Sequence, residues 1–92
     1  MKLVDFIERR KEIDDNLVIF IKNKNDWKSD IVLVDVQEKD EGDWIINGEK
    51  YFYFMEIFVA NDFIDDWLFS LPEIPSSNII AKRLFMYAIN DA

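Results

Sequence analysis

The amino-acid sequence predicts an α+β fold, with a small antiparallel sheet of three to four strands, an N-terminal helix and two C-terminal helices. Three observations indicate this class. Apolar residues recur at helical spacing only near the two ends of the chain, short apolar runs lie between them, and the turns joining those runs leave no room for crossover helices. We expect the 92 residues to form one domain over residues 1–92.

The first two elements are read from a change in the spacing of apolar residues. Leu3 and Phe6 belong to a helical repeat over residues 2–12, with charged residues on the opposite side, so a short amphipathic helix is predicted. A run of Asp and Asn then ends this helix. Residues 17–21 are five apolar residues rich in β-branched types, too few for a buried helix, and predict a central strand with both faces covered.

The middle of the chain predicts three further strands. Residues 22–30 are polar apart from Trp27 and form a loop, after which residues 31–36 make a strand antiparallel to the first. Asn47-Gly48 then gives the strongest hairpin signal, because a type I′ turn needs positive φ at both central residues. This turn pairs Trp44 with Tyr51.

Alternation along the hairpin sorts its side chains onto two faces. One face carries Trp44, Ile46, Tyr51 and Tyr53, and the other carries Ile45, Phe52 and Phe54. Both faces are aromatic or aliphatic, so the pattern leaves open which one is buried.

The C-terminal third of the chain predicts two helices. Residues 57–71 have apolar residues at helical spacing, and Pro72 disfavours helical geometry in the residue before it. Residues 76–78, Ser-Ser-Asn, are suited to cap a second helix, whose apolar stripe includes Ile80 and Leu84.

Several classes of chemistry lack the residues they need. The chain has no His and no Cys, and its two glycines are isolated, which excludes the usual nucleophile arrangements and phosphate-binding loops. Asp62 and Asp66, four apart on one helix, could hold a divalent cation, but a solvated surface accounts for them better. We therefore expect no enzyme activity, no metal and no cofactor.

Acidic and aromatic residues together predict a surface that binds a basic protein. Residues 35–43 carry a net charge of −4 and lead directly into an aromatic strand, and a second acidic group lies on the outer side of the 57–71 helix. Charge would steer encounter and aromatic anchors would supply buried area. The candidate contact residues are Asp35, Glu38, Asp40, Glu41, Asp43, Trp44, Tyr51, Tyr53, Asp62, Asp65 and Asp66.

The net charge of −8 also bears on partners and location. Surfaces that bind nucleic acid or anionic membranes neutralise phosphate with Lys and Arg, so neither is expected as a direct partner. The N-terminus lacks the pattern of a signal peptide, and no apolar run reaches the roughly 18 residues of a membrane span. A cytoplasmic protein is the simplest expectation.

In size, charge and absence of a catalytic set, the chain resembles the immunity proteins of bacterial toxin systems, including those of contact-dependent growth inhibition. The resemblance implies a protein that neutralises a nuclease or other basic toxin domain by covering its active site. The ending at residues 87–92, Tyr-Ala-Ile-Asn-Asp-Ala, is similar to that of a family of small uncharacterised bacterial proteins. No functional residue follows from that second likeness.

Three alternatives remain open at this stage. The chain could be a structural or regulatory module that forms a homodimer through its aromatic sheet face. It could mimic DNA, which would require carboxylates spaced like phosphates over an extended surface. The acidic residues could also serve only to keep a small domain soluble while the aromatic residues pack in the core.

Overall fold

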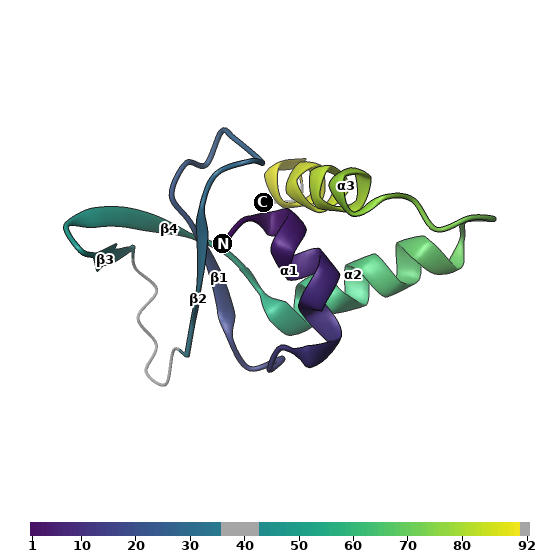
Figure 1. Ribbon diagram of the computed structural model, residues 1–92, viewed down its shortest axis with the longest axis horizontal. Coiled ribbons are helices and arrows are strands. Elements are labelled where there is room, and N and C mark those ends of the chain that lie inside the picture. Colours follow the sequence, from purple (N-terminus) through teal and green to yellow (C-terminus); the bar gives the residue numbers. More distant parts are fainter. Residues whose placement is uncertain (36–42, 91–92) are drawn as a thin grey trace.

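The predicted α+β class is confirmed by a computed structural model, which describes residues 1–35 and 43–90. An N-terminal helix precedes a four-stranded antiparallel sheet, and two helices follow it (Figure 1). The elements in chain order are α1 (Leu3–Arg9), the 3-10 turn η1 (Arg10–Glu12), β1 (Val18–Ile21), β2 (Ile31–Val34), β3 (Trp44–Ile46), β4 (Glu49–Glu56), α2 (Ile57–Phe69) and α3 (Ser77–Asn90).

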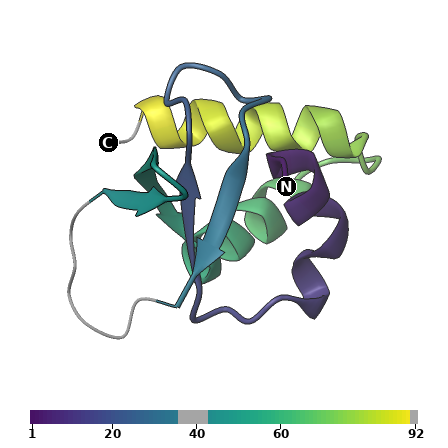
Figure 2. The same cartoon turned by 60° about the vertical axis from the view of Figure 1, so that its left-hand side comes forward.

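The strand order is β2-β1-β4-β3, which places β1 in the interior of the sheet as predicted. The hairpin register is also the predicted one, with Trp44 opposite Tyr51. Asn47 and Gly48 have φ of 53° and 79°, the positive values that a type I′ turn requires. Figure 2 shows the β3–β4 hairpin curling out of the plane of the other two strands.

All three helices lie against the same face of the sheet, while the β3–β4 hairpin projects away from them (Figure 1). The core between the two layers joins helical residues such as Phe6, Ile64 and Leu84 to Ile19 and Ile21 of β1, all of them almost fully buried. The apolar side chains of the three helices and of β1 therefore pack together in one layer.

A β-bulge changes the alternation of β4. Ile19 pairs with Met55 but Phe20 pairs with Tyr53, so Phe54 is the extra residue of β4. As a result Phe54 and Met55 both pack into the helix-side core, where the Phe54 ring stacks on Phe85 with centroids 6.1 Å apart. The bulge also strengthens the local twist, which agrees with the curl of the hairpin.

A second apolar cluster lies on the sheet face away from the helices. Phe20 is 1% exposed there, although no helix in the described part of the chain covers it. Its ring meets the rings of Trp44 and Tyr53 edge-on, with centroids 6.1 and 6.0 Å away. The curled hairpin thus brings β3 over β1, and both faces of the sheet hold buried side chains.

The last two helices end and begin close to the predicted residues. In α2, the Ser70 hydroxyl donates to the carbonyl oxygen of Trp67 at 2.7 Å, just after the final residue Phe69. In α3, the Ile79 N–H donates to Ser76 Oγ at 3.4 Å, so Ser76 acts as the predicted cap. Neither these helices nor α1 combines the length and apolar character that crossing a membrane requires, as far as the structure describes the chain.

Candidate functional site

The predicted acidic segment is only partly within the described residues. Asp35 and Asp43 are exposed, at the end of β2 and just before β3. The Asp43 carboxylate forms an exposed ion pair with Lys50 at 3.2 Å, an arrangement that contributes little to stability. The remaining predicted contacts of this segment, Glu38, Asp40 and Glu41, lie outside the described residues.

The three predicted aromatic anchors differ in how much of each remains accessible. Tyr51 is 8% exposed and packs within the second apolar cluster, and Trp44 is partly buried beside it. The indole Nε1–H of Trp44 is buried with no hydrogen-bond partner in the described chain, which costs about 1–3 kcal/mol. Tyr53 is half exposed, so it offers a partner more surface than the other two. Homodimerisation through this face stays a prediction.

Tyr53 is held by Glu56, its neighbour across the bulge in β4. The Tyr53 hydroxyl donates to Glu56 Oε1 at 2.8 Å. Partial burial of the phenol, together with this bond and the negative charge of Glu56, raises the pKa of Tyr53 to about 12. A neutral phenol is therefore maintained far above physiological pH.

Spectrophotometric titration is expected to show that one of the three tyrosines ionises well above the ordinary pKa of about 10. Tyr53→Phe should remove this high-pH phase. Glu56→Gln should move the phase only part of the way down, because burial, the largest single cause of the raised pKa, remains in the variant. Since the folded-state pKa is the raised one, the stability that Tyr53 contributes is complete below about pH 10 and is lost as pH rises through about 12. Three tyrosines titrating together near pH 10 would contradict this assignment.

The three predicted aspartates of α2 are all exposed but differ in their polar partners. Asp65 accepts a hydrogen bond at 2.7 Å from the buried guanidinium of Arg10, which also donates to Asn61 Oδ1 at 3.1 Å. The hydrogen bond and positive charge of Arg10 lower the pKa of Asp65. Asp62 and Asp66 are exposed and have no hydrogen bond or ion pair among residues 1–35 and 43–90. Asp65 therefore joins η1 to α2, whereas its two neighbours have no polar partner among the described residues.

Asp62 and Asp66 border a cavity between α2 and α3 of about 450 Å³, which we name the α2–α3 hollow. It is an open depression of the surface rather than an enclosed cavity. The hollow is lined by Val59, Asp62, Phe63, Asp66, Trp67 and Tyr87.

The aromatic wall of this hollow is assembled from both helices. Phe63 of α2 and Tyr87 of α3 stack with centroids 4.0 Å apart and planes 16° from parallel. Trp67, one turn after Phe63, has the guanidinium of Arg83 5.7 Å from its ring centroid. Two free carboxylates beside planar rings suit a cationic group. Among the described residues, no group of three or more acidic side chains is arranged to hold a metal ion.

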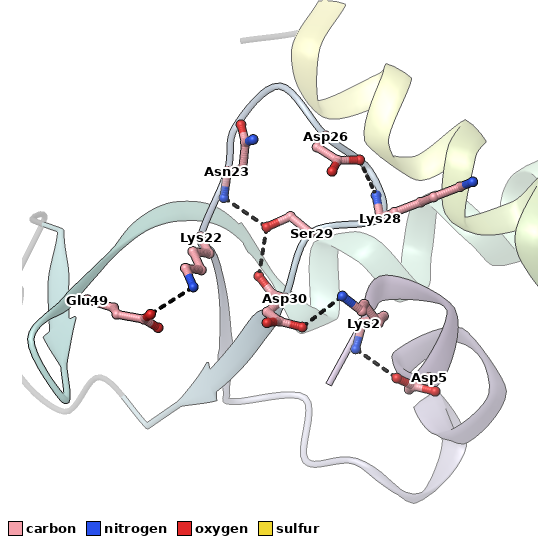
Figure 3. A network of polar contacts seen from close by, with 9 residues as sticks. All are labelled: Lys2, Asp5, Lys22, Asn23, Asp26, Lys28, Ser29, Asp30 and Glu49. Carbon is pink, nitrogen blue, oxygen red and sulfur yellow. Dashed lines mark hydrogen bonds and ion pairs between the residues drawn. The ribbon is translucent and has the colours of Figure 1, made fainter.

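A larger hollow, of about 600 Å³, lies by the β1–β2 loop and is lined by four lysines that were not among the predicted site residues. Lys2 and Lys22 are bound to Asp30 and Glu49, each at 2.9 Å. The side chain of Lys28 runs toward α3 rather than toward these two (Figure 3). Two of the four ammonium groups are already paired and that of Lys28 points elsewhere, so we interpret this region as a charged surface rather than as a ligand-binding site.

Sequence patterns indicate these two hollows only in part. Lys22, Lys24 and Lys28 fall within seven residues of a polar loop, but a net charge of −8 favours an acidic rather than a basic binding surface. Phe63 and Trp67 lie on the apolar stripe of their helix, a pattern that indicates core packing. Only the pairing of α2 with α3 shows that they also line a cavity.

Comparison with known proteins finds no matching family model, no matching curated protein and no matching solved structure.

Proposed function

We propose that this chain is a cytoplasmic immunity protein that binds a basic toxin domain through the α2–α3 hollow and so blocks that domain's active site. The observation that carries this proposal is the pair of exposed carboxylates, Asp62 and Asp66, which have no polar partner in the described chain and border an aromatic-lined cavity. A surface that docks on a basic protein uses charge for encounter and buried aromatic area for affinity. The hollow offers both.

A basic side chain can reach Asp62 or Asp66 without breaking an ion pair within this chain. Asp65 shows the contrast, because its carboxylate is already bound by Arg10 at 2.7 Å. Hydrogen bonds to charged groups contribute about 1.5–3 kcal/mol each. Since the two carboxylates have no polar partner in the described chain, a basic side chain that binds them displaces water and does not have to break an internal ion pair.

The net charge of −8 favours fast association with a basic partner, an effect that weakens as salt is added. Other predicted contacts would widen the interface beyond the hollow. Asp35, Asp43 and Tyr53 are exposed near the β3–β4 hairpin, which projects away from the helices, so they would join this interface only if the partner is large enough to reach both regions. The contacts predicted within residues 36–42, outside the described part of the chain, are Glu38, Asp40 and Glu41.

The double variant Asp62→Asn/Asp66→Asn is expected to weaken binding of the partner at least about tenfold, because two charge-assisted hydrogen bonds are lost while side-chain shape is kept. Affinity capture with the wild-type chain supplies the partner, which is then purified as a separate domain. Isothermal titration calorimetry measures the Kd, and a toxicity assay in cells tests whether protection falls in parallel.

The matched control is Glu8→Gln/Glu12→Gln, which removes two exposed carboxylates of α1 and η1 that do not line the hollow. It should change the Kd by less than about twofold at moderate salt, since salt largely screens exposed charges that lie more than a Debye length from the interface. Equal losses in both double variants would mean that net charge alone matters. A captured partner whose activity continues in the complex would rule out the immunity function.

A further inference from the structure

The carboxylates of the α2–α3 hollow have a defined spacing. Asp62 and Asp66 are four residues apart in α2, which places their Cβ atoms about 5–6 Å apart on one side of the helix. Phe63 and Trp67 repeat the same spacing one residue further along. The hollow therefore has a row of two carboxylates beside a row of two aromatic rings, with Tyr87 of α3 extending the aromatic row.

The aromatic row borders the two carboxylates, and the mutual stacking of Phe63 and Tyr87 covers one face of each of these two rings. Phe63 and Tyr87 stack almost parallel, with their planes 16° apart. The chain itself already sets one guanidinium against this wall, because Arg83 lies 5.7 Å from the centre of the Trp67 ring. Arg83 does not line the hollow, which leaves the space beside Asp62 and Asp66 open.

We propose that the α2–α3 hollow is an arginine-recognition site, in which one arginine side chain of the partner bridges Asp62 and Asp66 and lies along the aromatic wall. The proposal rests on the proposed function only for the source of this arginine. It adds the identity of the side chain that is recognised.

Arginine fits this arrangement better than lysine for two reasons. A guanidinium presents five N–H donors in a planar fork, so it can donate to two carboxylates one helical turn apart. An ammonium is a compact, strongly hydrated point charge that cannot match two separated acceptors and a flat wall at once. Guanidinium groups also stack on aromatic faces at less cost in hydration.

The test uses the full chain and two blocked amino acids of equal charge, Nα-acetyl-arginine amide and Nα-acetyl-lysine amide. Each is titrated at constant ionic strength while NMR follows the side chains of Asp62, Asp66 and Trp67. We expect saturable shifts with the arginine compound, at least about fivefold tighter than with the lysine compound. Asp62→Asn/Asp66→Asn should weaken arginine binding at least about tenfold, and Glu8→Gln/Glu12→Gln should leave it within about twofold.

Equal affinities for the two compounds, or shifts that saturate elsewhere on the chain, would overturn the proposal. The ligands are small molecules, so this result does not depend on finding a protein partner. Arginine selectivity at the hollow without any toxin partner would support this site and count against the immunity function. If Asp62→Asn/Asp66→Asn lost partner binding but the wild type showed no arginine selectivity, the immunity function would be supported and the arginine site would be ruled out.

Discussion

Phe20→Ala is expected to lower the free energy of unfolding by about 3–5 kcal/mol, the range for removing a buried Phe side chain. The ring is 1% exposed and touches Trp44 and Tyr53 edge-on, although it lies on the sheet face opposite the helices. A chain of this length has a total stability of about 5–14 kcal/mol, so the loss is a large fraction of it. Urea unfolding followed by circular dichroism measures the change.

Two further variants show whether the second apolar cluster is a true core. Phe6→Ala removes a fully buried ring from the helix-side core and should cost about the same 3–5 kcal/mol. Ile45→Ala shortens a side chain that is 72% exposed on the β3–β4 hairpin, and it should cost less than about 0.5 kcal/mol. If Phe20→Ala behaved like Ile45→Ala, the curled hairpin would not bury this face in solution.

The order of the elements could be predicted because each has a local cause. Asn47-Gly48 fixes the hairpin register through its positive φ values, and that register sets which residues share a face. The β-branched run at residues 18–21 forms the interior strand, and the Ser76 side chain caps α3. These signals act over a few residues, so they can be read directly from the sequence.

The apolar run at residues 17–21 predicted that both faces of the first strand are covered, but what covers its second face has a non-local cause and could not be predicted. Alternation placed Phe52 and Phe54 on one face, but it gave no sign that Met55 would join them through a bulge opposite β1. The curl that brings Trp44 onto Phe20 depends on strands that are not sequence neighbours. A small domain with apolar residues on both faces can thus bury both without a second helical layer.

The different roles of the three α2 aspartates could not be predicted from the sequence either. All three lie off the apolar stripe of the helix, so their helical positions predict one acidic patch. What separates them is Arg10, 55 residues earlier in the chain, which the packing of α1 brings to Asp65. Asp62 and Asp66 instead face a cavity that exists only because α3 packs beside α2. Spacing along the chain identifies candidate carboxylates but not their tertiary partners.

Asp65→Ala is expected to lower the free energy of unfolding by about 2 kcal/mol. Removing one partner of a fully buried ion pair costs about 3–5 kcal/mol, because the remaining charge stays buried without compensation. The Arg10 side chain is 9% exposed, but the Asp65 side chain is 51% exposed, so water screens the pair and the estimate is reduced. Arg10 also keeps its hydrogen bond to Asn61 in the variant. Thermal and urea unfolding at neutral pH measure the loss.

The neighbouring residue provides the control. Asp66→Ala removes an equal charge that has no polar partner among the described residues, and it should cost less than about 0.5 kcal/mol.

The pH dependence of stability gives a second test. Arg10 lowers the pKa of Asp65, so this stabilisation is complete above the ordinary value of 3.8 and is lost as pH falls through the lowered value. The stability curves of wild type and Asp65→Ala should therefore converge in acid. In partner binding we expect the opposite order. Asp66→Ala should weaken binding, whereas Asp65→Ala, under conditions where it is folded, should bind as the wild type does. If Asp66→Ala destabilised the chain as much as Asp65→Ala, Asp66 would have a structural role that the α2–α3 hollow does not explain.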